Sequence, residues 1–274
     1  MKSSALQIAP NSLPFDSMAD SYDDVFTDTI VGRAQRRQVW DETDLHFHPG
    51  DRILEVNCGT GVDALHLAQR GVRVFACDSS PRMVGVARQR IQSAGLGDTV
   101  DLQVLATEEI AQLESNSLFD GVLSNFAGLN CVEGHSAVAQ DLSRLLKPGA
   151  KALICLFGPC CLWEIAWYLA QGDSSRALRR FRRRGTRAHL GDNASLSVHY
   201  PTVREVQLLF APHFSLCTWK GIGFAVPPSY LEFLATRFPG FFRAAEKADL
   251  WLGRFPGIRG LADHVLLTFE RRRV

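Results

Sequence analysis

Lysine is scarce in this sequence of 274 residues, and neither sign of charge dominates it. Basic residues number 30 and acidic residues 29, which gives a formal net charge of +1. That balance argues against the broad positive surface with which proteins bind nucleic acid, so no nucleic-acid partner is expected. Only five of the basic residues are Lys and the other 25 are Arg, whose planar guanidinium suits bidentate contacts with anions.

The seven cysteines lack the features of a disulfide framework or a zinc site. Their number is odd, no two of them form a C-x-x-C pair, and most lie in apolar surroundings. We therefore expect reduced, mostly buried thiols, as in a cytosolic protein. The histidines are scattered without metal-ligand spacing, so no metal site is expected either.

Long apolar runs are also missing. The N-terminal stretch MKSSALQIAPNSLPF has no apolar core of signal-peptide length. The longest apolar stretch, residues 153–170, is interrupted by Gly158-Pro159 and carries Glu164. A membrane-spanning helix needs about 20 predominantly apolar residues, so a buried strand that leads into a buried helix is favoured. These absences predict a cytoplasmic protein with no transmembrane segment.

From residue 50 to 157, short apolar runs alternate with helical patterns. Runs of strand length occur at 52–56, 72–77, 100–105, 119–124 and 150–157. Between them lie patterns of helical period such as VDALHLAQRG and SPRMVGVARQRIQSAG. Strands that alternate with helices at this spacing predict a parallel sheet with helices on both faces.

The flanking regions have a different pattern. Residues 1–29 are expected to form an arm with one ordered element around FDSMADSYDDVF, and residues 30–44 a helix. After residue 157 come an aromatic helix, an Arg-rich run, a helix opened by Thr202, a strand near 215–225, a helical excursion, and a last strand at 263–270. Trp163, Trp167 and Tyr168 recur at helical spacing, which is typical of core packing.

Polar residues and glycines follow the first four apolar runs, and these positions are candidate ligand contacts. Residues 52–63 read RILEVNCGTGVD, a strand followed by a glycine turn and a helix. The second run ends at Asp78, 19 positions beyond Gly59, a spacing at which an acid binds ribose hydroxyls. The pairs Thr107-Glu108 and Asn125-Phe126 follow the third and fourth runs. Ligands bind at the carboxyl ends of parallel strands, so we expect all four clusters to meet in one cleft.

Glu55 decides between two interpretations of the glycine turn. A dinucleotide-binding loop remains compatible with the glycine spacing, because Ala64 occupies its third glycine position. A carboxylate at the mouth of the turn would, however, repel a pyrophosphate. It suits a ligand that carries an ammonium or a sulfonium group.

These segments together resemble the class I S-adenosylmethionine-dependent methyltransferases of the small-molecule type. The stretch ILEVNCGTG is similar to their first motif and FACDSSPRMVGVAR to their second, while LATEEI, FDGVLSNFAGLNCV and LLKPGAKALICLF are similar to the segments that follow. The resemblance covers residues 50–157. It implies an α/β, Rossmann-like, doubly wound sheet of seven strands in the order 3-2-1-4-5-7-6 with an antiparallel last strand.

The resemblance also implies a division of the single compact chain. Residues 1–45 would form a helical arm over the active site, and residues 46–157 the core that binds S-adenosylmethionine, whose product form is S-adenosylhomocysteine. Residues 158–274 would supply helical insertions that cap the acceptor and the last two strands of the sheet.

The resemblance further implies a set of cofactor-binding residues. One member departs from the family pattern: Asn57 replaces the first glycine of the motif, and Asn tolerates a left-handed backbone best among the other residues. Ala106 replaces an acid that many relatives have near the adenine, so that contact is assigned to Thr107 or Glu108. Tyr22 resembles an aromatic residue that closes over the cofactor. The full set is Glu55, Asn57, Cys58, Gly59, Gly61, Asp78, Ser79, Met83, Thr107, Glu108, Asn125, Phe126 and Tyr22.

Several functions remain open at this stage. The leading one is methyl transfer to a small molecule; the alternatives are a nucleotide-dependent oxidoreductase, a module that binds the cofactor without catalysis, and a nucleic-acid methyltransferase. Enzymes of the last kind that methylate base amines often carry an Asn/Asp-Pro-Pro-aromatic motif after the fourth strand, where this chain has Ser124-Asn125-Phe126-Ala127. A general base is needed only if the acceptor loses a proton, so no catalytic residue is assigned.

The expected acceptor is a small, partly apolar molecule that could carry an acidic group. The apolar part depends on aromatic residues in the second half, which are Trp163, Trp167, Phe224, Tyr230, Phe233, Phe238, Phe241, Phe242 and Trp251. The acidic part depends on the Arg-rich run from Arg176 to Arg187, which is either a solvated face or an anion-binding wall.

Overall fold

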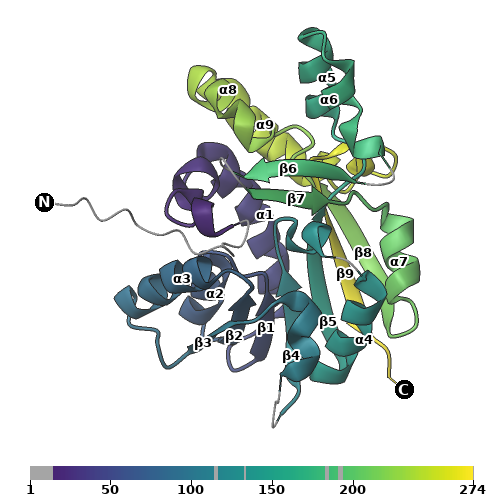
Figure 1. Cartoon of the computed structure of the whole chain (residues 1–274). Coiled ribbons are helices and arrows are strands. Elements are labelled where there is room, and N and C mark those ends of the chain that lie inside the picture. The colour runs from purple at the N-terminus through teal and green to yellow at the C-terminus, as the bar shows by residue number, and fades with distance from the viewer. Residues whose placement is uncertain (1–14, 114–116, 133, 183–184, 191–193, 274) are drawn as a thin grey trace, which may run out of the picture.

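The computed structural model describes residues 15–113, 117–132, 134–182, 185–190 and 194–273. The first 14 residues of the expected arm lie outside this part. The centre of the molecule is a seven-stranded sheet with the strand order β3-β2-β1-β4-β5-β9-β8 (Figure 1). The sixth and seventh strands of this sheet along the chain are β8 and β9, so the predicted order 3-2-1-4-5-7-6 is confirmed.

The strands lie close to the predicted ranges. They are β1 Arg52–Val56, β2 Arg73–Asp78, β3 Val100–Val104, β4 Phe119–Ser124, β5 Leu146–Phe157, β8 Phe214–Ile222 and β9 His264–Arg271. The pairs within β1 to β5 are parallel. The last strand, β9, runs antiparallel to both β5 and β8, as predicted.

Helices cover both faces of the sheet. On one face lie α1 (Ile30–His46), α2 (Val62–Gln69) and α3 (Pro81–Ser93), and on the other α4 (His135–Leu145) and α7 (Val203–Phe210). Successive residues of a strand point to opposite faces, and the two hydrophobic cores show this alternation. Leu153 and Cys155 of β5 belong to the core under α1 to α3, whereas Ala152 and Ile154 belong to the core under α4 and α7.

The remaining elements form a cap beyond the carboxyl ends of the parallel strands. It comprises α5 (Leu162–Ala170), α6 (Ser174–Ala177), the antiparallel hairpin of β6 (Thr186–Leu190) and β7 (Ala194–Val198), α8 (Glu232–Arg237) and α9 (Pro239–Leu252). In Figure 1 the hairpin crosses between the sheet below and α5, α8 and α9 above. The sequence did not predict this hairpin, because its strands are short and polar and follow an Arg-rich run.

Short helical turns complete the chain. They are a π-helical turn at Asp23–Thr27 and 3-10 turns at Asp16–Met18, Thr107–Gln112, Gly128–Cys131, Arg179–Phe181, Ser229–Leu231 and Arg259–Leu261. All seven cysteines are free thiols, and Cys58, Cys77, Cys155 and Cys161 are buried.

The prediction that α5 packs into the core is wrong. Its only buried residue is Glu164, and the helix stands away from the body together with α6 (Figure 1). Trp167 contacts Phe233 of α8, with 5.6 Å between the ring centroids. The helical spacing of aromatic residues therefore reflects contacts within the cap, while the carboxylate of Glu164 points to the body of the protein.

Asp249 of α9 holds the loop that follows β8. This fully buried carboxylate accepts hydrogen bonds from the backbone N–H groups of Gly223, Phe224 and Ala225 at 2.9, 2.8 and 2.7 Å. It also accepts one from Gln38 Nε2 of α1 at 3.0 Å. One side chain thereby fixes α9 to both the sheet and α1.

We predict that Asp249→Ala lowers the free energy of unfolding by about 3 kcal/mol or more. The substitution leaves the N–H groups of buried Gly223 and half-buried Phe224 and Ala225 without their acceptor, and a buried group so left costs about 1 to 3 kcal/mol. The matched control is Glu246→Ala on the same helix, which removes a pair with the exposed Arg37 and should cost about 0 to 1 kcal/mol. Urea unfolding measures both; equal losses in the two variants would contradict this assignment.

Candidate functional site

A cavity of about 390 Å³ lies at the carboxyl ends of the parallel strands. It is bounded by the N-terminal arm, the loops after β1, β2 and β4, and the cap. Its lining residues are Phe15, Met18, Tyr22, Val25, Phe26, Arg36, Asn57, Cys58, Gly59, Thr60, Val62, Asp63, Asp78, Met83, Asn125, Phe126, Ala127, Gly128, Cys131, Phe157, Arg179, Arg180, Leu196, Val198, Pro228, Ser229, Tyr230, Asp263 and His264. The cavity has the size of a small-molecule site.

The glycine turn forms one wall of this cavity. Asn57, Gly59 and Gly61 all have a left-handed backbone, with φ of 58°, 53° and 74°. The prediction that Asn57 can replace a glycine in this conformation is confirmed. Its side chain is held from outside the cavity, because Thr107 Oγ1 donates a hydrogen bond to Asn57 Oδ1. Gly61 is required for a second reason: a Cβ there would lie 2.7 Å from the Cβ of Ala87.

Asp78 at the end of β2 faces the cavity beside the glycine turn. Its two carboxylate oxygens accept hydrogen bonds from the backbone N–H groups of Gly59 and Ser80, both at 2.9 Å. Burial raises the pKa of Asp78 above its usual value, while the two N–H groups act in the opposite direction. The structure thus brings Asp78 and the turn together, as the sequence predicted.

Glu55 differs from its predicted position at the mouth of the turn. The residue is 1% exposed and does not line the cavity. Its Oε2 atom has no hydrogen-bond partner among the described residues. Burial raises the pKa of Glu55 well above the usual range, the nearby Asp63 raises it further, and Arg36 lowers it. Glu55 lies within β1, and the residues that line the cavity begin only after this strand, at Asn57.

Asp63 joins three separate segments next to Glu55. Its carboxylate accepts hydrogen bonds from Arg36 at 2.5 Å, from Trp40 Nε1 at 2.7 Å and from Asn125 Nδ2 at 2.9 Å. The sequence predicted only that Asp63 complements the start of α2. Arg36 and Trp40 were missed, although their i, i+4 spacing places both on one side of α1.

Aromatic rings and the Arg36 guanidinium form a continuous layer beside this network. The guanidinium carbon of Arg36 lies 4.7 Å from the ring centroid of Phe126, and the rings of Phe126 and Phe26 are 4.8 Å apart. Phe126 and Ala127 have positive φ values of 45° and 66° without being glycine. Such backbone strain is concentrated at functional sites, and here it turns Phe126 into the cavity.

Carboxylates attach the described part of the arm to the core. Asp23 accepts hydrogen bonds from Thr60 Oγ1 at 2.8 Å and from Arg90 at 2.5 Å. Asp16 accepts one from Ser80 Oγ, also at 2.5 Å. The arm therefore covers the glycine turn from outside.

Tyr22 of the arm lines the cavity, in agreement with its predicted place. Burial raises the pKa of its hydroxyl to about 12. The hydroxyl therefore stays protonated near neutral pH.

Two residues of the Arg-rich run form ion pairs with buried carboxylates. Arg179 and Arg180 both bind Glu164, and Arg180 also binds Asp263 at 2.6 Å. Arg180 is 5% exposed. Neither a solvated face nor an anion-binding wall describes these two residues, because their positive charges are already balanced. Sequence reasoning missed Glu164 and Asp263 as their partners.

His264, at the start of β9, was also missed. Its ring stacks on Phe157 with 4.5 Å between the centroids, and it meets the edge of Phe126 at 5.3 Å. Burial lowers the pKa of His264 to about 4; Asp263 raises it and Arg180 lowers it further. The imidazole is therefore neutral at pH 7. No local pattern marked this residue, because its surroundings come from three distant segments.

The predicted set of ligand contacts is only partly assembled. Asn57, Cys58, Gly59, Asp78, Met83, Asn125, Phe126 and Tyr22 line the cavity. Ser79 and Glu108 are exposed and, like Gly61 and Thr107, do not line it. Of the nine aromatic residues expected around an acceptor, only Tyr230 lines the cavity. No group of side chains suited to a metal ion occurs in the described part of the chain.

Comparison with known proteins agrees with the fold and the glycine turn. The family described as "Methyltransferase domain" matches residues 53–149. A demethylmenaquinone methyltransferase from Symbiobacterium thermophilum is 32% identical over 187 residues, which cover 61% of this chain and 72% of that protein. One from Mycobacterium sp. (strain KMS) is 32% identical over 145 residues, which cover 52% of this chain. The match spans only 57% of the length of that mycobacterial relative.

Two solved structures share the fold. The CcbJ methyltransferase from Streptomyces caelestis has a TM-score of 0.61 and 16% identity, with 96% of this chain and 100% of that chain covered. A putative sarcosine dimethylglycine methyltransferase from Galdieria sulphuraria has a TM-score of 0.59 and 17% identity, with 94% and 98% covered. At these identities the likeness extends to the fold alone.

We predict that His264 makes the stability of the protein depend on pH between about 4 and 6.5. In this range the unfolded chain binds a proton at His264 that the folded chain does not, so unfolding free energy rises with pH. At about 1.4 kcal/mol per pKa unit the rise amounts to roughly 3 kcal/mol. Chemical unfolding at several pH values should show a smaller rise of the unfolding free energy with pH in His264→Gln. The control is His48→Gln, at an exposed histidine, where the rise should be unchanged. An unchanged rise in His264→Gln would contradict the assignment.

Proposed function

The chain belongs to the class I S-adenosylmethionine-dependent methyltransferases, and from this premise we propose that it transfers the cofactor's methyl group to a small, partly apolar molecule. The observation that carries the proposal is the composition of the cavity. One wall holds the glycine turn and Asp78, and the opposite wall is mostly apolar. We further propose that residues 46–157 hold the cofactor, while residues 1–45 and 158–274 enclose the acceptor.

The residues present fit S-adenosylmethionine. Two buried polar atoms at the glycine turn, Glu55 Oε2 and Asn57 Nδ2, have no hydrogen-bond partner in the described part of the chain. Glu55 does not line the cavity, so its charge would act on a cationic ligand through space, whereas a ligand with acceptor atoms suits Asn57 Nδ2. Asp78 would hold the ribose hydroxyls, and Tyr22 and Phe126 would lie against the bound molecule. When bound, the cofactor supplies a methyl carbon activated by its sulfonium for in-line displacement.

The protein's contribution to such a reaction is alignment and the exclusion of water. Bringing two reactants together in a fixed orientation supplies much of the rate in reactions of this type. Phe26, Phe126 and Phe157 are positioned to exclude water, since they line the same cavity from the arm, the loop after β4 and the end of β5. The contacts of Asp23 with Thr60 and Arg90 keep the arm in place over this cavity.

The acceptor side of the cavity is apolar and electrically balanced. Phe157, Leu196, Val198 and Tyr230 line it. The arginines there are paired with Glu164 and Asp263. The apolar part of the expected acceptor is therefore kept in the proposal. The acidic part is not, because Arg179 and Arg180, the two described residues of the run that line the cavity, are already paired with carboxylates.

His264 is the residue that can accept a proton where the acceptor must lose one. It lines the cavity and is neutral at pH 7, because its pKa is lowered to about 4. Its Nδ1 atom lies 3.4 Å from Asp263 Oδ2, so Nε2 is the atom assigned to the proton. The carboxylates that line the cavity, Asp63, Asp78 and Asp263, already accept hydrogen bonds from the protein.

Because the chain belongs to a methyltransferase family, a nucleotide-dependent oxidoreductase is no longer one of the alternatives. A nucleic-acid acceptor is the remaining alternative to a small molecule. The relatives from Mycobacterium and Symbiobacterium are named for demethylmenaquinone, which favours a small molecule without identifying the compound here. A nucleic-acid substrate would also need a track of phosphate-binding cations, whereas Arg179 and Arg180 are paired with carboxylates.

Methyl transfer can be tested directly with labelled S-adenosylmethionine. The protein is incubated with the label and, in separate reactions, with a fractionated small-molecule extract, RNA and DNA. Label in a small-molecule fraction supports the proposal. Label in nucleic acid alone, or in no fraction, would overturn the proposed acceptor class.

The control variant for this assay is Asp78→Ala, which we predict to weaken binding of S-adenosylhomocysteine by at least about tenfold without loss of the fold. Charge-assisted hydrogen bonds to the ribose are worth about 1.5 to 3 kcal/mol each, and 1.4 kcal/mol is a factor of ten. Calorimetric titration gives the affinity, and circular dichroism checks the fold. Unchanged affinity in a folded Asp78→Ala protein would exclude the ribose role.

We predict that binding of S-adenosylhomocysteine releases a proton from Glu55. The pKa of Glu55 is raised well above its usual range in the free protein, and the ammonium group of the ligand favours the ionised form. Affinity should then rise with pH, and the heat of binding should differ between phosphate and Tris buffers. Glu55→Gln should remove this difference, whereas Glu270→Gln, which removes a pair with Lys151 and does not line the cavity, should keep it. Equal heats for the unaltered protein in both buffers would exclude the linkage.

A further inference from the structure

The outer side of α9 exposes large apolar side chains that neither the fold nor the proposed site uses. Phe241 is 57% exposed, Leu250 50% and Trp251 82%, and Phe255 in the following turn is 61% exposed. Isolated exposed apolar residues are common, but a group of them on one surface indicates an interaction site. Phe241 and Trp251 were expected from the sequence to surround an acceptor, but they do not line the cavity.

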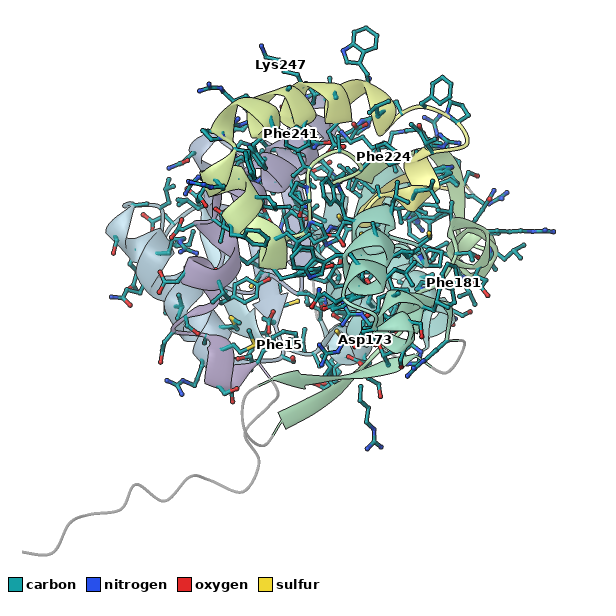
Figure 2. All side chains as sticks on the ribbon, turned by 90° about the horizontal axis from the view of Figure 1, so that it is seen from above. Phe15, Asp173, Phe181, Phe224, Phe241 and Lys247 are labelled. Atoms are coloured by element: carbon teal, nitrogen blue, oxygen red, sulfur yellow. The ribbon has the colours of Figure 1, made fainter. Side chains whose placement is uncertain are left out.

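The exposed residues form two adjoining stripes along the helix. Phe241, Ala244, Ala248 and Trp251 follow one another at intervals of three and four residues, so they share one side of α9. Arg243 and Lys247, four residues apart, lie on the adjoining side and are exposed. Figure 2 shows Lys247 on the outer side of α9, directed away from the body of the protein.

The inner side of α9 holds the helix rigidly in place. Phe242 and Ala245 are buried against Val31 and Ala34 of α1 and against Ala235 of α8. The hydrogen bonds of Asp249 add to this attachment. The outer stripes are therefore presented on a fixed helix.

The acidic residues of α8 and α9 are engaged with the body of the protein, while Asp41 of α1 is exposed in a hollow that Leu250 and Trp251 also line. Residues 232–257 contain three acids and four basic residues. Glu232 accepts hydrogen bonds from the backbone N–H groups of Ile30 and Val31 at 2.7 and 3.0 Å. Glu246 pairs with Arg37, and Asp249 is fully buried. The outer side of α9 itself therefore exposes the cations Arg243 and Lys247, although the whole chain is nearly neutral.

An apolar groove of about 470 Å³ opens beside these stripes, between α5 and α9. Leu162, Trp163 and Ala166 line it from α5, Phe224 from the loop after β8, and Phe241 and Ala245 from α9. Figure 2 places Phe241 on α9 and Phe224 next to it. All the residues that line this groove are apolar, so it suits a hydrocarbon chain.

We propose that the outer side of α9, together with this groove, docks on the surface of an anionic lipid bilayer. Aromatic side chains flanked by basic ones are the composition of helices that lie in the membrane interface. Trp is favoured at the depth of the headgroups, and each Lys or Arg near an anionic leaflet adds about 1 kcal/mol. None of the described helices is long and apolar enough to cross a membrane, so α9 lies along the bilayer surface.

Cosedimentation with vesicles tests this proposal. We use the whole protein with vesicles of phosphatidylglycerol and phosphatidylcholine in equal amounts, and with vesicles of phosphatidylcholine alone. The unaltered protein should bind the anionic vesicles, more weakly at high salt, and bind the neutral vesicles less. Trp251→Glu and the double variant Phe241→Ala/Trp251→Ala should weaken binding to anionic vesicles by about tenfold or more. Each removes an aromatic side chain that the bilayer would otherwise bury.

A charge variant and a control separate the two contributions. Arg243→Gln/Lys247→Gln should remove the preference for anionic vesicles and keep the weaker binding to neutral ones. The control is Leu208→Glu on α7, where Leu208 is 63% exposed and lies outside the proposed surface; it should bind as the unaltered protein does. S-adenosylhomocysteine affinity checks that each variant keeps its core.

Three results would overturn the proposal. The first is a failure of the unaltered protein to bind anionic vesicles. The second is equal weakening by Leu208→Glu and Trp251→Glu. The third is that the protein self-associates or binds RNA in the absence of vesicles, and that Trp251→Glu abolishes this binding but leaves vesicle binding unchanged. That result would assign the surface to a second copy of the chain or to nucleic acid.

Discussion

The ion pair between Arg36 and Asp63 is the contact on which the arrangement of the site depends. Both side chains are almost completely buried. Removing one partner of such a pair commonly costs about 3 to 5 kcal/mol, because the other charge is left without compensation. The pair joins α1 to the start of α2, and Asn125 adds the loop after β4 to the same carboxylate. Three segments that are distant in sequence are thereby fixed around one side of the cavity.

A second buried network stands on the other side of the cavity. Arg180 binds Glu164 of the cap and Asp263 at the end of the sheet. The two networks enclose a layer of rings in which Phe126 contacts Arg36 on one side and His264 on the other. Charges are therefore satisfied at both ends and apolar surface is left between them. This separation explains how the cavity can combine a polar wall at the glycine turn with an apolar wall opposite it.

The sequence predicted the parts of the fold that depend on local pattern. The ranges of β1 and β4, the strand order, and the left-handed backbone of Asn57 follow from apolar runs, glycine spacing and the resemblance to a family. The roles of Arg36 and His264 could not be predicted in this way, because their partners are brought together by the tertiary fold. The aromatic spacing of α5 was misleading for a related reason. Periodicity shows that residues share one side of a helix, but not whether that side meets the core or another helix of the cap.

The attachment of the arm has a consequence for the order of events in the site. The arm lies over the glycine turn and is held by Asp16 and Asp23, whose partners Ser80, Thr60 and Arg90 belong to the glycine turn, the loop after β2 and α3. A molecule bound beneath the arm stays covered on that side while these carboxylate contacts persist. Lid opening and product release limit the turnover of many enzymes. We therefore expect a gate whose opening rate increases with ionic strength, because salt screens the two charge pairs that join the arm to α3, Asp23 with Arg90 and Asp20 with Arg82.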